Sequence, residues 1–261
     1  MYLVKEIKIS KLWASLLALV AAISPVGAEE IRVAVASNFS GAAKAIAGEF
    51  ERQSGHTVTI VSGSSGKHYA QIINGAPFDA FFSADRWRPE RLEREGVAEA
   101  GSRFTYALGR VVLWSPEPGL VDGAGEVLES GAFRHLALAN PKLAPYGRAA
   151  QQILQGRGVW QPLQGRIVRG ENIAQTFHFI KSGNVKLGFV AYSQISQPGE
   201  PFTGSLWVPP QPLYTPIEQQ AVLLSGNGVA RAFISYIKSD EVQEIIRGFG
   251  YGIGSIDNDG K

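Results

Sequence analysis

The chain has 261 residues, of which 45% are hydrophobic, with 30 glycines, 14 prolines and no cysteine. This composition excludes a disordered, collagen-like, coiled-coil or polytopic membrane protein, and the lack of cysteine excludes disulfides, thiolate nucleophiles and cysteine-ligated metals. Residues 1–28 hold three lysines and one glutamate, so the remaining 22 basic and 22 acidic residues balance. A surface that binds nucleic acid or another polyanion is therefore not expected.

The first 28 residues have the layout of a secretory signal peptide. Three lysines flank the start of an apolar run over residues 12–23, Pro25 interrupts this run, and small residues lead to Ala28, after which we expect the cut. A helix of 12 residues would be about 18 Å long, too short for a hydrocarbon core of about 30 Å. The sequence therefore predicts export from the cytoplasm, with a retained membrane anchor as the alternative.

Strands and helices alternate from residue 31 onward. Residues 31–36 predict a strand, and the apolar residues Ala43, Ile46, Ala47 and Phe50 then recur at helical spacing. This succession predicts a parallel α/β arrangement. The further elements expected in this unit are a strand over 57–62, a helix over 68–74, a strand over 78–83, a helix capped by Asp85 and ending at Leu92, and a β-rich run over 107–114.

A second unit repeats the alternation from about residue 130. Two β-rich segments join the units, so we expect an α/β fold of two lobes with a ligand cleft between them. The chain is expected to cross over near Leu108 and to return near Gln220, which assigns 29–109 and 221–261 to the first lobe and 110–220 to the second. The further expected elements are strands over 134–139, 166–168, 186–191 and 218–224, and helices over 145–155, 172–181, 229–237 and 242–246.

The sequence lacks the usual signatures of enzymes and metal sites. The turn over residues 62–67 is not a phosphate-binding loop, because Val61 and His68 stand where that motif needs a glycine and a hydroxyl residue. The four histidines lack metal-ligand spacing. The glycine-rich residues 248–254, which no helix follows, are expected to form a loose tail. We therefore expect no catalytic residue and no free metal cation.

Small polar residues follow two of the predicted strands. Ser37 and Asn38 come after the first strand, and Ser64 and Ser65 come after the second. The carboxyl ends of neighbouring parallel strands are where such folds bind ligands. Hydroxyls and free backbone N–H groups at helix N-termini attract anions. The two turns therefore predict a neutral anion cradle, although simple helix capping is the common use of such residues.

Six motifs extend this interpretation over nearly the whole mature chain. They are Val33-Ala-Val-Ala-Ser37-Asn-Phe-Ser, Ser62-Gly-Ser-Ser-Gly66, Gly75-Ala-Pro-Phe-Asp79-Ala-Phe-Phe-Ser-Ala-Asp85, Leu138-Ala-Asn-Pro-Lys-Leu-Ala-Pro-Tyr-Gly147, Gly170-Glu-Asn-Ile-Ala174 and Leu187-Gly-Phe-Val-Ala-Tyr192. With these motifs in this order, the chain resembles the periplasmic molybdate-binding proteins (ModA-like) of ABC importers. The resemblance implies a type II periplasmic binding protein of the Venus-flytrap kind, which binds molybdate or tungstate and uses no cofactor. It also implies a monomer that delivers the oxyanion to an inner-membrane permease with a cytoplasmic ATPase.

The resemblance also implies the ligand-binding residues. It places hydroxyl and N–H donors at Ser37 and Ser65, and a backbone donor at Ile173. Members with a Ser/Thr-Asn turn use that asparagine and take a tyrosine from the Ala-Pro-x-Gly turn, which here gives Asn38 and Tyr146. Other members use a tyrosine near position 191, where this chain has alanine and Tyr192 follows.

The expected donor set is neutral and contains no carboxylate. A buried dianion needs many donors, and a protonated oxyanion such as hydrogen phosphate also needs an acceptor for its own hydroxyl. Molybdate and tungstate are alike in charge and size, so one site should take both. Three alternatives remain: a sulfate-type oxyanion receptor, a sensor that docks a membrane receptor, and a secreted serine hydrolase. The hydrolase would use Ser64 or Ser65 as the nucleophile, with His68 or another histidine and an acid nearby.

Overall fold

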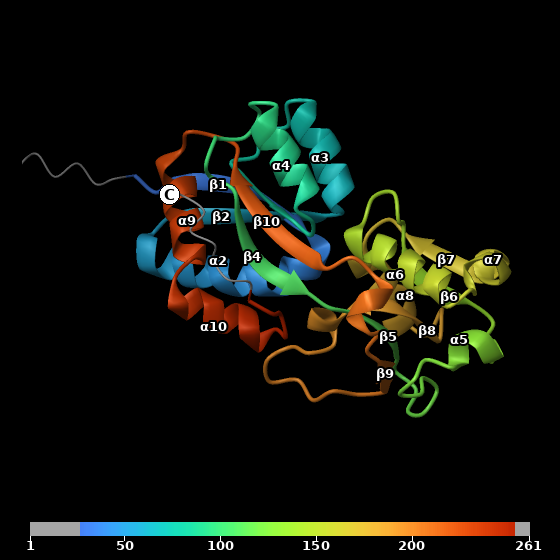
Figure 1. The fold of residues 1–261 in the computed structure, drawn as a ribbon. Coiled ribbons are helices and arrows are strands. Elements are labelled where there is room, and N and C mark those ends of the chain that lie inside the picture. The colour runs from blue at the N-terminus through green and yellow to red at the C-terminus, as the bar shows by residue number, and fades with distance from the viewer. Residues whose placement is uncertain (1–26, 254–261) are drawn as a thin grey trace, which may run out of the picture.

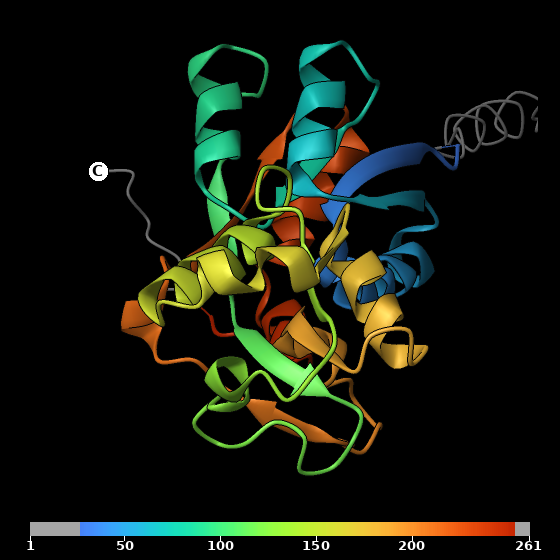
Figure 2. The same ribbon diagram turned by 90° about the vertical axis from the view of Figure 1, so that its right-hand side faces the viewer.

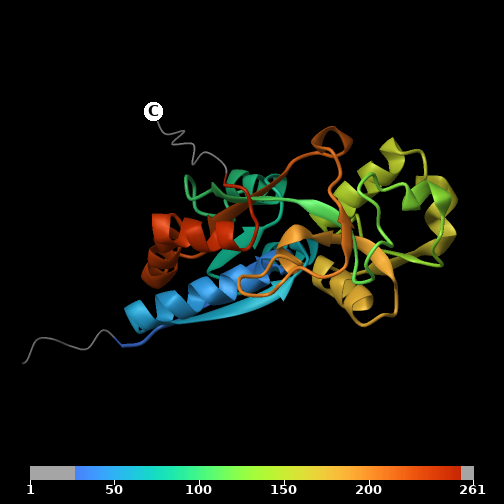
Figure 3. The same cartoon turned by 90° about the horizontal axis from the view of Figure 1, so that it is seen from below.

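Two five-stranded sheets form the centres of two lobes in the computed structural model, which describes residues 27–253 (Figure 1). The signal peptide expected over residues 1–28 lies outside the described residues, except for its last two. Seen from below, the lobes lie side by side and extended segments link them (Figure 3). The predicted α/β fold with two lobes is confirmed.

The first sheet combines parallel and antiparallel strands. Its strands, in their order across the sheet, are β2 (Thr57–Gly63), β1 (Glu30–Ala36), β3 (Ala80–Ser83), β10 (Ile217–Leu223) and β4 (Phe104–Gly109). β1 pairs in parallel with β2 and β3, whereas β10 runs antiparallel to β3 and β4. All four residues of β3 are buried. A continuous apolar run of this kind indicates a strand that is covered on both faces.

Helices cover both faces of the first sheet. They are α2 (Ser40–Ser54), α9 (Gly228–Ile237) and α10 (Asp240–Gly248) on one face, and α3 (Ser65–Ile73) and α4 (Trp87–Arg94) on the other. Ile46 and Phe50 of α2 pack with Phe233 of α9, and Phe50 meets Phe233 edge-on. α2 ends at Gly55, whose positive φ suits a left-handed C-cap. Figure 2 shows α3 and α4 (cyan to green) as a pair that extends beyond the second lobe.

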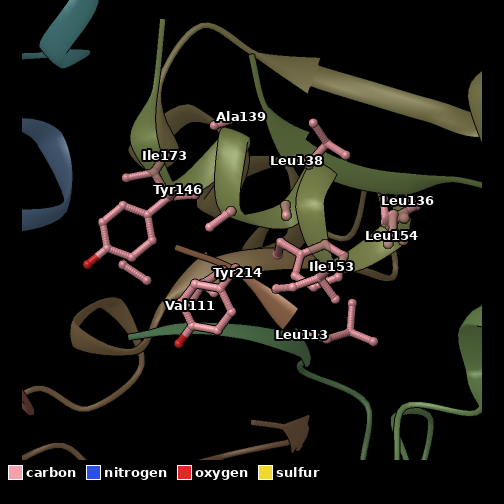
Figure 4. Close-up of a cluster of buried hydrophobic side chains, with 14 of the residues drawn as sticks. Val111, Leu113, Leu136, Leu138, Ala139, Tyr146, Ile153, Leu154, Ile173 and Tyr214 are labelled. Atoms are coloured by element: carbon pink, nitrogen blue, oxygen red, sulfur yellow. The ribbon is translucent and has the colours of Figure 1, made fainter. Parts of the chain in front are cut away.

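The second lobe repeats this plan with a smaller sheet. Its strands, in order, are β7 (Ile167–Gly170), β6 (Leu136–Ala139), β8 (Leu187–Ala191), β5 (Val111–Ser115) and β9 (Ser205–Trp207). Its helices are α5 (Val127–Ser130), α6 (Pro145–Gly156), α7 (Trp160–Leu163) and α8 (Ile173–Lys181). α6 and α8 lie on opposite faces of the sheet. Figure 4 shows the apolar core that holds α6 on the sheet, with Ile153 and Leu154 packed on Leu136 and Leu138.

Two segments carry the chain between the sheets. β4 ends at Gly109 in the first sheet and β5 begins at Val111 in the second, so Arg110 is the crossing residue. The proline-rich residues 208–216 carry the chain back. We call these two segments the hinge. β10 already pairs with β4 at Ile217, so residues 217–220 lie in the first sheet and not in the second lobe, where the sequence had placed them. The strand begins directly after Pro216, a residue that lacks the N–H needed inside a sheet.

Most predicted elements are present, with differences at their ends. α3 begins at Ser65, three residues before the expected start, because the Ser64 side chain accepts a hydrogen bond from the Lys67 N–H and caps the helix. The three short elements β9, α5 and α7 were not predicted, since three or four residues show no measurable periodicity. Three-residue 3-10 turns also occur, namely η2 (Ser37–Phe39), η3 (Gln164–Arg166), η4 (Tyr192–Gln194) and η5 (Gln211–Leu213).

The C-terminal glycine-rich segment is not a loose tail in its described part. Gly252 forms an antiparallel bridge with Leu108, and the two residues exchange backbone hydrogen bonds of 2.7 and 2.9 Å. Tyr251 is buried beside Phe39 in the core of the first lobe. A single aromatic side chain and a backbone pairing therefore fix a segment whose composition indicated disorder.

Among residues 27–253, no helix combines the length and the apolar character that crossing a bilayer requires.

Replacement of Gly147 by alanine should destabilise the fold. A Cβ at this position would lie 2.1 Å from the Ala139 carbonyl oxygen, a backbone atom that cannot move aside. We expect Gly147→Ala to cost about 2–3 kcal/mol and to lower Tm by roughly 5–10 °C in thermal denaturation. The control is Gly48→Ala inside α2, where nothing lies within 4 Å and alanine should add about 1 kcal/mol. Equal effects of the two changes would contradict this prediction.

Candidate functional site

Four helical segments begin at one small cavity between the lobes. The first lobe contributes η2, which leads into α2, and the start of α3; the second contributes the starts of α6 and α8. All five residues expected from the sequence lie in this lining. The lining residues are Ala36, Ser37, Asn38, Gly63, Ser64, Ser65, Ala84, Ala144, Pro145, Tyr146 and Ile173. None of them carries a charge.

The two serine hydroxyls are arranged as donors toward the cavity. Ser65 Oγ accepts the Ala84 N–H at 2.9 Å, and Ser37 Oγ accepts the Ala174 N–H at 3.3 Å. A hydroxyl has one proton of its own. Because each oxygen already accepts from a backbone N–H, its proton remains available for a further acceptor in the cavity. Both serines are buried, so water does not compete freely for these protons.

Backbone N–H groups at the helix starts add further donors. The N–H groups of Ser65, Tyr146 and Ile173 belong to first turns, where no intrahelical acceptor exists. Within residues 27–253, no hydrogen bond to any of these three N–H groups is found. Helix N-termini also carry partial positive charge. The cavity is therefore electropositive without a cationic side chain in its wall.

The Asn38 amide is held from behind the cavity. Its Nδ2 donates to Gln219 Oε1 at 2.6 Å and to the Tyr251 hydroxyl at 3.1 Å, and the Tyr146 hydroxyl lies 3.5 Å away. The backbone oxygen of Asn38 accepts from the Tyr251 hydroxyl at 2.7 Å. The side chain is thus part of a buried polar cluster, and its direct contact with a ligand stays a prediction.

Tyr146 brings a phenol from the second lobe to this cluster. Its side chain is 1% exposed, and it lies beside Ile173 at the edge of the α6 core (Figure 4). The phenol oxygen rests over Gly109 of the hinge, where a Cβ would approach it to 2.3 Å. Burial raises the pKa of Tyr146 well above that of an ordinary phenol. The group is therefore protonated at neutral pH and can donate a hydrogen bond.

Tyr192, the alternative tyrosine, lies elsewhere. Its ring packs under the Arg110 guanidinium, 4.2 Å from the ring centroid, and against Gly250. It is not part of the cavity lining.

Sequence reasoning missed three buried polar residues behind the cavity, namely Tyr106, Gln219 and Tyr251. Tyr106 and Gln219 lie on strands that read as ordinary core, and Tyr251 lies in the segment expected to be loose. The Tyr106 hydroxyl donates to the Ser83 carbonyl at 3.1 Å and lies 3.5 Å from Gln219 Oε1. The one available sequence signal was Tyr251, which stands between two glycines. An isolated aromatic residue needs a packing partner, so its presence indicates that the segment packs on the core.

Several contacts join the lobes around the cavity. The Gly66 N–H donates to the Leu143 carbonyl at 2.9 Å, and the Ser193 hydroxyl donates to the Asn38 carbonyl at 3.2 Å. These contacts draw the lobes together. The cavity measures about 10 Å³, roughly the space that one water requires. A tetrahedral anion therefore requires one lobe to move slightly outward.

A larger cleft adjoins the cavity on the hinge side. It encloses about 340 Å³, and its lining includes Asp85, Arg86, Arg148 and Glu218. Its two carboxylates and two guanidinium groups balance one another in charge. Burial raises the pKa of Asp85, whose main charged partner is the buried Arg88.

The serines do not form a hydrolase site in this structure. Ser64 Oγ accepts from the Lys67 N–H, and Ser65 Oγ accepts from Ala84. His68 is buried with its Nδ1 3.2 Å from Gln71 Oε1, and burial lowers the pKa of its imidazole. In the described chain, no serine hydroxyl is hydrogen-bonded to a histidine imidazole, so the nucleophile and base pair is absent there. The same residues contain no group of three histidine, aspartate or glutamate side chains that could hold a metal ion.

Comparison with known proteins places this geometry in context. The family model described as bacterial extracellular solute-binding protein matches residues 31–252. The molybdate-binding protein ModA of Azotobacter vinelandii is 48% identical over 229 residues, which cover 87% of this chain and 91% of the relative. ModA of Rhodobacter capsulatus is 46% identical over 243 residues, covering 91% and 94%. The solved structure of the A. vinelandii periplasmic molybdate-binding protein superposes with a TM-score of 0.83 over 86% of this chain and 99% of that one, at 46% identity.

The buried tyrosines around the cavity should make the protein unstable at alkaline pH. Burial raises the pKa of Tyr106, Tyr146 and Tyr251 above the usual value of about 10. Above pH 10 the unfolded chain loses these protons while the folded chain retains them. The free energy of unfolding should then fall by up to about 1.4 kcal/mol per tyrosine and pH unit, with no such loss below about pH 9. Urea denaturation across this range measures the slope, which Tyr251→Phe should reduce by about one third. An unchanged slope in this variant would contradict the prediction.

Proposed function

Because the chain belongs to the bacterial extracellular solute-binding protein family, we propose that it is a receptor that binds molybdate and tungstate. It acts outside the cytoplasm, and a signal peptide over residues 1–28 is removed near Ala28. It is a binding protein rather than an enzyme, and it uses no cofactor. Molybdenum enters the site only as the oxyanion.

The observation that carries this proposal is the neutral cavity at which four helical segments begin. An unpaired charge in a dry cavity is prohibitively costly, so a dianion needs a donor for each of its oxygens. The hydroxyls of Ser37 and Ser65, the phenol of Tyr146 and the backbone N–H groups of Ser65 and Ile173 supply these donors. Helix dipoles spread the compensating charge over both lobes.

Asn38 completes this set from the first lobe. Its side chain lines the cavity, and its amide supports the Tyr146 phenol, 3.5 Å away. The side chains of the lining offer hydroxyl and amide groups but no carboxylate. Hydrogen phosphate carries a proton of its own, which would need a carboxylate to accept it. Because the lining has none, this proton would stay unpaired, and the site would bind hydrogen phosphate poorly. Tungstate has the same charge and shape as molybdate and should bind equally.

Binding and delivery follow from the two-lobed form. The anion first meets one lobe, and the other then closes over it by rotation about the hinge. The closed monomer is the form that presents molybdate to an inner-membrane permease with a cytoplasmic ATPase. The permease recognises the closed form because the surfaces of the two lobes then have a fixed relative position.

Molybdate should raise the melting temperature by mass action. At a concentration about 100 times Kd, binding adds about 2.7 kcal/mol, which corresponds to a rise of roughly 5–10 °C. Tungstate should give a similar rise, and hydrogen phosphate at the same concentration should give none. A thermal-shift series with molybdate, tungstate, sulfate and phosphate measures this. An equal shift with sulfate would favour the sulfate-type receptor, and hydrolysis of an ester that Ser65→Ala abolishes would favour the hydrolase.

Removal of the Tyr146 hydroxyl should weaken binding without unfolding the lobe. Tyr146→Phe keeps the ring in the α6 core and deletes one donor to a charged oxygen, so Kd should rise about 10–100-fold in isothermal titration calorimetry. The matched control is Tyr192→Phe, whose ring packs under Arg110 outside the cavity. This control should bind like the natural protein. A larger loss in the control would transfer the donor role to Tyr192.

A further inference from the structure

Two neighbouring glutamines of β10 are both buried. Gln219 is 0% exposed and Gln220 is 7% exposed. Adjacent residues of a regular strand point to opposite faces, and glutamine is mostly found at the surface. Here the pairing of β10 with β4 shifts in register, since Gln219 stands opposite Ala107 and Gln220 opposite Thr105. The extra residue of this bulge is Tyr106 of β4, and bulges are over-represented next to functional sites.

The Gln219 side chain lies at the back of the anion cavity. Its Oε1 accepts from Asn38 Nδ2 at 2.6 Å, the shortest of the three contacts made by that amide nitrogen. The Tyr106 hydroxyl lies 3.5 Å from the same oxygen. Gln219 Nε2 is buried, and no hydrogen-bond partner for it is found in the described residues. A buried amide with an unsatisfied donor is destabilising, so the side chain is not explained by fold stability.

We propose that Gln219 is a positioning residue for the anion cavity. By accepting a hydrogen bond from Asn38, it fixes the orientation of the Asn38 amide and, through that amide, the direction in which the Tyr146 phenol donates. This inference rests on the proposed function, because it assigns a role within the same site.

The orientation of the Asn38 amide decides how many donors face the cavity. With Nδ2 toward Tyr146, the phenol oxygen accepts and its proton is directed away from Asn38. If the amide turned over, its carbonyl oxygen would accept the phenol proton instead. The cavity would then lose the phenol as a donor.

This arrangement exists before the lobes close. Gln219, Asn38 and Tyr251 all belong to the first lobe, whereas Tyr146 belongs to the second. Closure therefore brings the phenol onto an amide whose direction is already set. Groups that are ordered in advance cost less to order on binding, so Gln219 strengthens binding without touching the anion.

The test replaces Gln219 with leucine, which keeps the volume and removes the acceptor. We expect Gln219→Leu to weaken molybdate binding about tenfold or more in isothermal titration calorimetry, while Tm without ligand changes little. In an Asn38→Ala background, Gln219→Leu should change Kd by less than about twofold, because the residue then has nothing to orient. The matched control is Gln220→Leu. Gln220 contacts Arg103 and Thr105, each at 3.0 Å, so its removal should affect stability more than affinity.

Two results would overturn the proposal. One is an equal loss of affinity from Gln219→Leu with and without Asn38. The other is an unchanged Asn38 side-chain amide signal in nuclear magnetic resonance spectra of ligand-free Gln219→Leu. The second measurement needs no ligand, so it decides the role of Gln219 even if the natural protein fails to bind molybdate. Such a failure would overturn the proposed function separately.

Discussion

Under the proposed function, the cavity between the lobes stabilises negative charge without a cationic side chain in its wall. Every group that lines it is neutral, and the buried guanidinium of Arg88 is paired with the carboxylate of Asp85. The attraction for an anion must therefore come from oriented dipoles: hydroxyl groups, N–H groups and the positive ends of helices. Dipoles act only at short range, so the geometry of the wall decides which anion is stable there.

Both lobes meet this requirement with the same arrangement of strands and helices. In each lobe, parallel strands end at the cavity and the following helices begin there: β1 leads into η2, and β6 is followed by α6. Each lobe alone offers half of the donors. Closure brings the donors of both lobes to one cavity. The closed form is held mainly by hydrogen bonds of backbone groups and hydroxyls. The one cross-lobe ion pair among the described residues, Lys67 with Glu171, is exposed on both sides and contributes little.

The sequence predicts the parts of this arrangement that depend on local pattern. Ser37 and Ser65 follow apolar strands and precede helices, so their place at one sheet edge could be inferred from the chain itself. Tyr146 and Ile173 could not be found in this way, because a tyrosine after proline and an isoleucine in a helix are common. Only the resemblance to a family singled them out. The structure brings all four together with Asn38, and their contact with a ligand remains a prediction.

What the sequence could not predict depends on contacts between distant segments. The burial of Gln219 arises from the place of β10 between β3 and β4, both of which lie more than a hundred residues earlier in the chain. Tyr251 is ordered by Phe39 and by the Asn38 carbonyl, about two hundred residues away. Neither effect leaves a periodic pattern. The boundary at Ile217 was misplaced for a related reason, since strand residues look alike whichever sheet they join.

Two glycines near this site are required because a side chain would not fit there, and not because of their backbone conformation. Gly66 and Gly109 have no positive φ, so another residue could adopt their backbone angles. Yet a Cβ at Gly66 would lie 2.9 Å from the Leu143 oxygen of the other lobe, and one at Gly109 would lie 2.3 Å from the Tyr146 hydroxyl. The closest approach at each position is to an atom of the other lobe, although Arg88 and Ile217 of the same lobe would each lie 3.0 Å away. A side chain at either glycine would therefore oppose closure more directly than the folding of the first lobe.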